Sequence, residues 1–303
     1  MLRNQSRCRS ASAGLASLSL MLFSLTPAIG QTRPSPGGPP QSSIRQGFLD
    51  LPGVRLFYRD SGGTGVPVVF LHAATADSRG WEHQIPIFTS AGYRFIAFDR
   101  RGSGQSVIDD RGPQPGSSAD DLRALMDHLK IDRFHVVGTG AGGFVALDVA
   151  LSFPTRLRSV VVACAQGGVQ DQEFQDVVAR LRSPEFNKLS VDFHELSPSY
   201  RAANPEGVRR WLEFERASRV SGRRSGYPPM RSRITYALLE TIATPLLFVA
   251  GGADLYAPPA LMRLVAARVK GSEFVVVPEA GHSAYWEEPE AFNAEVLRFI
   301  RRR

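Results

Sequence analysis

The stretch from Val136 to Phe144 constrains the possible folds more than any other part of this sequence. It begins with two valines, continues through four glycines interrupted by Thr139 and Ala141, and ends on an aromatic residue. An apolar run predicts a strand, clustered glycines predict a tight turn, and the apolar residues that follow predict a helix. A strand that enters a helix through a short turn is a building unit of α/β proteins.

Apolar runs with the length of strands recur from residue 46 onward. The predicted strands are residues 48–51, 54–58, 68–71, 94–98, 134–137, 160–164, 246–250 and 274–277. The first two flank Pro52 and Gly53 and are predicted to form a hairpin. The later runs are almost continuously apolar, which is typical of strands buried on both faces. We therefore predict an α/β fold with a mostly parallel central sheet and helices on both of its faces.

Helical patterns alternate with these strands. Residues 120–129 place four apolar side chains at i, i+3, i+4 and i+7, and a final helix is predicted over residues 289–302. Between residues 166 and 239 the sequence is richer in charge, and its helical patterns are short. We predict a helical cap there, inserted into an α/β core of residues 46–165 and 240–303.

The first thirty residues differ from the rest of the chain. Arg3, Arg7 and Arg9 precede a mostly apolar stretch over residues 13–29, and small residues surround position 30. This pattern predicts a signal peptide (1–30) that is cleaved before Gln31, and hence a periplasmic or secreted protein. A permanent membrane anchor is the alternative, but the apolar run is short for a stable membrane span. Residues 31–45 are predicted to be a Pro/Gly-rich linker.

The formal net charge of +7 arises mainly at the N-terminus, because residues 1–45 contain five arginines and no acidic residue. The remaining chain is nearly balanced, which argues against nucleic acid as a partner. Cys8 lies in the predicted signal peptide, so Cys164 has no partner for an internal disulfide and is predicted to be buried and inert. We expect a small-molecule substrate or ligand, and no cofactor or metal ion.

Five short motifs follow one another in a characteristic order. They are residues 71–74 with Trp81, residues 98–106, residues 138–142, residues 251–254 with Pro258, and residues 281–282. Each motif alone is weak, but the ordered set over residues 46–303 resembles the α/β-hydrolase superfamily. That resemblance implies a nucleophile, an acid and a histidine in this chain order, together with an oxyanion hole made of backbone amides.

By that resemblance His282 is the base, Asp254 is its acidic partner, and the amides of Ala74 and Ala141 form the oxyanion hole. Ala73 stands where the family usually has a glycine. If that glycine needs a positive φ, the alanine alters the loop and the position of one amide.

Gly140 occupies the centre of the G-x-S-x-G nucleophile motif, so the position of the nucleophile has no side chain. Four interpretations are open. The protein binds a ligand without chemistry; His282 and Asp254 activate a water or a substrate hydroxyl; a neighbouring hydroxyl replaces the serine; or the glycine was engineered. The neighbouring hydroxyls are those of Thr139, Ser103 and Ser283.

The predicted function is that of a hydrolase-superfamily enzyme without a serine nucleophile. It would act on a small ester, lactone or carbonyl substrate through the His282–Asp254 general base. A non-catalytic, ligand-binding pseudohydrolase is the main alternative. A cofactor-free lyase or oxygenase on the same fold is the other, because fold alone does not define chemistry.

Overall fold

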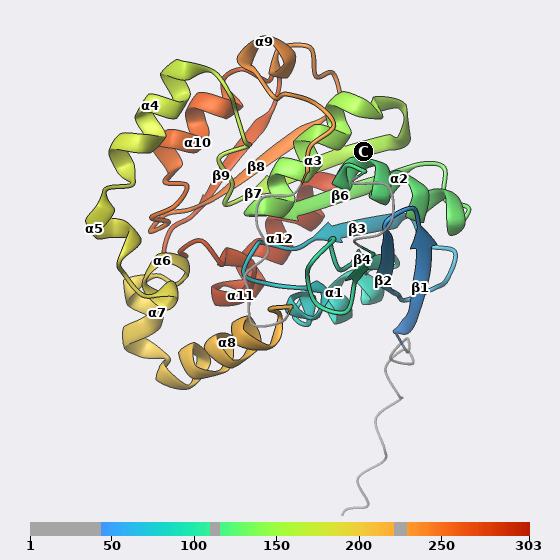
Figure 1. Cartoon of the computed structure of the whole chain (residues 1–303), viewed down its shortest axis with the longest axis horizontal. Coiled ribbons are helices and arrows are strands. Elements are labelled where there is room, and N and C mark those ends of the chain that lie inside the picture. The colour runs from blue at the N-terminus through green and yellow to red at the C-terminus, as the bar shows by residue number, and fades with distance from the viewer. Residues whose placement is uncertain (1–43, 110–115, 221–228) are drawn as a thin grey trace, which may run out of the picture. The chain divides into compact units, whose positions relative to one another are not determined.

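The computed structural model describes residues 44–109, 116–220 and 229–303 (Figure 1). The predicted signal peptide and almost the whole predicted linker lie outside these residues. Within them, no helix is both long enough and apolar enough to cross a membrane.

One sheet of nine strands organises the described part of the chain. The strands are β1 (Arg45–Leu51), β2 (Val54–Asp60), β3 (Pro67–Leu71), β4 (Arg94–Phe98), β5 (Val107–Ile108), β6 (Phe134–Thr139), β7 (Leu157–Ala163), β8 (Leu246–Gly251) and β9 (Glu273–Val277). Their order is β1-β2-β4-β3-β6-β7-β8-β9, with β5 beside β2. The pairs from β4 to β9 are parallel, and those involving β2 are antiparallel. The predicted hairpin and the mostly parallel sheet are confirmed.

Helices pack on both faces of the sheet, as predicted. One core layer contains α2 (Ser118–His128), α3 (Ala141–Ser152) and α10 (Pro259–Ala266); the other contains α1 (Ile85–Ser90), α11 (Ala284–Glu287) and α12 (Pro289–Ile300). Adjacent residues Val136 and Val137 of β6 belong to opposite layers. This explains the continuous apolar runs, because both faces of the central strands are buried.

Several predicted boundaries shift by a few residues: the first strand begins at Arg45 rather than at residue 48, and the last helix ends at Ile300 rather than at residue 302. Two further corrections have a local physical reason. Helix α2 begins at Ser118, two residues before the predicted start, because the Ser117 hydroxyl accepts a hydrogen bond from the Asp120 N–H and caps the helix. Cys164 was predicted within a strand, but β7 ends at Ala163 and Cys164 has a φ of 44°. Its side chain is buried, as expected.

The described chain between β7 and β8 is helical. It contains α4 (Gln172–Leu181), α5 (Pro184–Asn187), α6 (Val191–Glu195), α7 (Pro198–Ala203), α8 (Pro205–Ala217) and α9 (Tyr236–Leu239), drawn from yellow-green to orange in Figure 1. Several of these helices begin with a capping serine, threonine or asparagine. The limits of a separate cap domain stay a prediction. Two 3₁₀ turns, η1 (Ser78–Trp81) and η2 (Pro154–Arg156), complete the fold.

Candidate active site

Gly140 forms the turn between β6 and α3, with φ 52° and ψ −121°. Side chains rarely adopt this φ, so the conformation suits glycine. A Cβ atom built on Gly140 would lie 3.2 Å from His282 Nε2 and 3.1 Å from Ala73 Cβ. The turn is tight on its other side as well, since a Cβ at Gly142 would lie 2.1 Å from the Leu71 carbonyl oxygen. Residue 140 therefore faces the histidine imidazole.

The structure brings His282 and Asp254 together from the loops that follow β9 and β8. His282 Nδ1 lies 2.9 Å from Asp254 Oδ2 and 3.1 Å from Oδ1. The Asp254 carboxylate is fully buried, and its Oδ1 also accepts hydrogen bonds of 2.8 Å from the N–H groups of Tyr256 and Ala257. These donors fix the carboxylate, so His282 Nδ1 donates to Asp254 while Nε2 faces Gly140.

The electrostatics of His282 result from burial and two carboxylates. Burial alone would lower the pKa of His282, but the charges of Asp254 and Glu195 outweigh it and raise the pKa to about 9. His282 is therefore mainly an imidazolium at neutral pH. Any reaction that needs its neutral form has to become faster as the pH rises toward 9.

The loop after β3 is held by a buried histidine. His72 Nδ1 donates to the Ala73 carbonyl oxygen at 2.7 Å, and the Arg100 N–H donates to His72 Nε2 at 3.0 Å. These partners require a neutral ring, which agrees with a His72 pKa held well below its usual value by burial and by Arg100. The motif at residues 98–106 thus supports this loop through Arg100.

Ala73 fits this loop without the backbone conformation that would require glycine. Among the described non-glycine residues, positive φ occurs only at Lys130 and Cys164. The predicted conflict between an alanine and a positive φ is therefore absent at Ala73. Its methyl group instead lies next to Gly140 and occupies space close to where a side chain at position 140 would begin.

The two predicted oxyanion amides belong to the residues that follow Gly140 and Ala73 in the chain. Ala141 is the first residue of α3, where an N–H has no acceptor within its own helix. Ala74 follows the His72–Ala73 anchor in the loop after β3. Their function as an oxyanion hole stays a prediction.

The three alternative hydroxyls are placed differently. The hydroxyls of Thr139 and Ser103 are buried and have no hydrogen-bond partner among the described residues. Ser283 Oγ donates to Glu195 Oε2 at 3.2 Å. Within the described chain, none of the three hydroxyls is hydrogen-bonded to His282, so none is activated by the base in this conformation.

Sequence reasoning missed two buried acids beside His282. Glu195, at the end of α6, accepts hydrogen bonds from Thr75 and Ser283. Glu287, in α11, accepts 2.7 Å and 3.0 Å hydrogen bonds from the N–H groups of Ser197 and Gly281. The sequence held no signal for either residue, because single glutamates in short helices are usually exposed.

Glu287 is expected to make stability depend on pH. Burial raises its pKa to about 7, so the folded state binds more protons than the unfolded state between about pH 4.5 and 7. The stability that Glu287 contributes is complete below this window and is lost as the pH rises through it, on the order of 3 kcal/mol. Glu287→Gln is expected to flatten this part of the pH dependence in urea unfolding. Glu279→Gln, an exposed control, should retain the wild-type profile; an unchanged profile in Glu287→Gln would refute the assignment.

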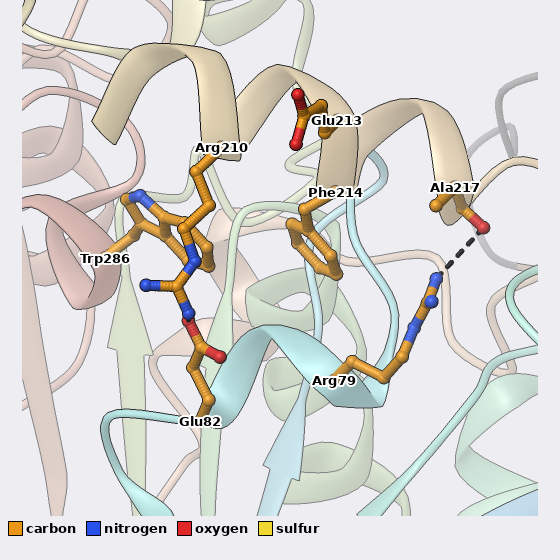
Figure 2. Close-up of a pocket in the computed structure, with 7 residues that line it drawn as sticks. All are labelled: Arg79, Glu82, Arg210, Glu213, Phe214, Ala217 and Trp286. Carbon is orange, nitrogen blue, oxygen red and sulfur yellow. Dashed lines mark hydrogen bonds and ion pairs between the residues drawn. The ribbon is translucent and has the colours of Figure 1, made fainter. Parts of the chain in front are cut away.

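A separate groove of about 370 Å³ lies where α8 meets η1 and α11 (Figure 2). It is lined by Arg79, Glu82, Arg210, Glu213, Phe214, Ala217 and Trp286. The rings of Phe214 and Trp286 stack at 5.6 Å, Arg210 pairs with Glu82, and Arg79 donates to the Ala217 carbonyl oxygen at 2.9 Å. Because these groups already satisfy one another, we assign no ligand to this groove. In the described chain, no cluster of three or more potential metal ligands is present.

Comparison with known proteins identifies the family. Residues 68–295 match the sequence pattern of the Alpha/beta hydrolase family. The chain is 29% identical to the Mycobacterium tuberculosis protein BpoC, which carries the provisional name of a non-heme bromoperoxidase, over 82% of this chain and 98% of BpoC. It is also 29% identical to a 2-hydroxy-6-oxononadienedioate/2-hydroxy-6-oxononatrienedioate hydrolase of Burkholderia vietnamiensis, over 82% of this chain and 92% of that protein. The chain therefore belongs to the alpha/beta hydrolase family.

Solved structures agree with this assignment. A thermophilic esterase from Thermogutta terrifontis matches with a TM-score of 0.70 and 25% identity, over 85% of this chain and 98% of the esterase. The enol-lactonase from Burkholderia xenovorans matches with a TM-score of 0.69 and 22% identity, over 84% of this chain and all of the lactonase. The latter comparison shows the shared fold alone.

Proposed function

We propose that this protein is a hydrolase-type enzyme that acts on a small ester, lactone or carbonyl substrate without a serine nucleophile. Gly140 takes the position of the nucleophile, His282 and Asp254 form the general base, and the amides of Ala74 and Ala141 form the oxyanion hole. The observation that carries the proposal is the orientation of His282: Nδ1 is held by Asp254, and Nε2 points toward Gly140. The hydrolase and esterase names among the relatives support this substrate class.

The chemistry follows from the missing side chain. A water molecule or a substrate hydroxyl next to Gly140 would donate its proton to His282 Nε2 as its oxygen attacks the carbonyl carbon. The two amides would stabilise the negative charge that develops on the carbonyl oxygen. In triad enzymes, binding and the oxyanion hole alone still accelerate reactions by roughly 10³- to 10⁴-fold over water, so a measurable rate without a nucleophile is physically reasonable.

Ligand binding without turnover is the second candidate, and the charge of His282 favours it. An imidazolium at neutral pH is a poor base but a good hydrogen-bond donor to an anion. The pH dependence separates the two candidates. General-base turnover rises as the pH approaches about 9, whereas binding of an anion weakens over the same range.

His282→Ala is expected to lower the rate of turnover at least about tenfold, since it removes the base. The rate would be measured on a panel of activated aryl esters and lactones, with protein that starts at Gln31, the proposed mature N-terminus of an exported protein. His128→Ala, at the exposed end of α2, is the matched control and should retain the wild-type rate. Equal rates in wild type and His282→Ala would reject the hydrolytic proposal in favour of binding.

A further inference from the structure

Glu195 is a buried acid that the proposed chemistry does not use. It is the last residue of α6, and only 4% of its surface is exposed. Thr75 Oγ1 donates to its Oε1 and Ser283 Oγ donates to its Oε2, each at 3.2 Å. Both carboxylate oxygens are thus occupied by hydroxyl donors, an arrangement that suits an ionised group.

The two donors belong to the two loops that carry the proposed machinery. Thr75 follows Ala74, the residue of one proposed oxyanion amide, and Ser283 follows His282. The Ser283 N–H also donates to the Glu195 carbonyl oxygen at 3.0 Å. Glu195, which belongs to the helical segment between β7 and β8, therefore contacts the residue that follows His282 and the residue that follows Ala74.

The backbones approach closely at this point. A Cβ on Gly281 would lie 2.7 Å from the Ser197 nitrogen and 3.0 Å from the Glu195 carbonyl oxygen. A side chain at position 281 would therefore force the two segments apart. This packing fixes the distance between the end of α6 and the loop that carries His282.

Three charged groups act on the His282 ring. Asp254 contacts Nδ1, Glu195 raises the pKa of His282 together with Asp254, and Arg182 lowers it. Tyr285 interacts with Glu195, and Glu287 interacts with Asp254. Burial raises the pKa of Glu195, the positive charge of His282 opposes this, and Asp254 adds to it. An imidazolium between two carboxylates is better stabilised than one beside a single acid.

We propose that Glu195 is a positioning residue of this site: its carboxylate aligns the loops that carry His282 and Ala74, and its charge stabilises the imidazolium form of His282. A role of Glu195 in catalysis rests on the proposed function. Its effect on the charge of His282 does not, because the protonation of His282 can be measured even in a protein without activity.

The test is a titration of His282 by NMR in protein labelled at histidine, with His282→Ala used to assign the signal among the six histidines. Glu195→Gln is similar in shape and removes the charge. It is expected to lower the apparent pKa of His282 by about one pH unit. Glu195→Asp keeps the charge and should restore most of the wild-type value. Glu213→Gln, the same change on the exposed face of α8, should leave the titration unchanged.

An unchanged His282 titration in folded Glu195→Gln would overturn the proposal. If that variant does not fold, the carboxyl carbon of Glu195 in the wild-type protein is titrated instead; a protonated Glu195 at pH 7 would also overturn it. Failure of the proposed function gives a different pattern. There, His282→Ala does not slow ester turnover, while Glu195→Gln still changes the His282 titration.

Discussion

The double variant Ala73→Gly/Gly140→Ser is expected to hydrolyse an activated aryl ester at least ~100-fold faster than the wild-type protein. The introduced hydroxyl would lie within reach of His282 Nε2, because the Cβ position is only 3.2 Å from that nitrogen. Removal of the Ala73 methyl group relieves the 3.1 Å contact that a side chain at position 140 would make. Burst kinetics and the mass of an acyl adduct on the new serine provide the measurement.

The two single variants are the controls for this experiment. Gly140→Ser alone should gain less activity, since Ala73 crowds the serine, and Ala73→Gly alone should gain none. The serine has to adopt a φ of 52°, so we expect the unfolding free energy to fall by about 1 to 3 kcal/mol. Absence of an acyl adduct in the folded double variant would contradict the proposed alignment of residue 140, His282 and the two amides.

The second large effect is expected from Asp254→Asn. This variant should have a lower pKa of His282 and a turnover about 100-fold or more slower than that of the wild-type protein. Asparagine presents no charge to the imidazolium and reverses the hydrogen bond to Nδ1 if its amide group faces the ring. The backbone donors of Tyr256 and Ala257 favour that orientation, because they require the side-chain oxygen. NMR titration of His282 and ester turnover would be measured on the same sample.

Asp254→Asn is also expected to change how the free energy of unfolding depends on pH. The pKa of His282 is raised in the folded state to about 9, so its contribution is complete below about pH 6.5 and is lost as the pH rises through 9. The contribution is on the order of 3 kcal/mol. Urea unfolding of the wild-type protein should show this loss between pH 6.5 and 9, and Asp254→Asn should not. Parallel profiles for the two proteins would contradict the ion pair.

The sequence predicts those parts of the site that depend on local patterns, namely the strands and the residues that directly follow them. The alternation of apolar runs predicts a parallel sheet, and the carboxyl ends of parallel strands meet at one edge. Asp254 follows β8, His282 follows β9 and Gly140 follows β6, so their order along the chain places them together. Adjacent valines of β6 serve opposite core layers, which is why the sheet was predictable from apolar content alone.

The parts that sequence reasoning missed depend on contacts between distant segments. Glu195 is 120 residues from Thr75 and 88 from Ser283, and Glu287 is 90 from Ser197. The helices that supply these contacts are short, and their charged residues predict exposure. Burial of Glu195 follows only once α6 packs against two loops of the core. The contact of Ala73 with position 140 also joins distant segments. The strand–turn–helix pattern predicts the turn, but it does not predict which residue packs against it.

The close packing of Gly281 against residues 195–197 has a consequence for how molecules enter and leave. Hydrogen bonds cross this contact in both directions, from Ser283 to Glu195 and from Ser197 to Glu287. Any motion that separated the end of α6 from the core would break them and would displace the loop of His282 at the same time. A passage that opens while the site stays assembled therefore has to run elsewhere, and residues 195–197 stay in place when it opens.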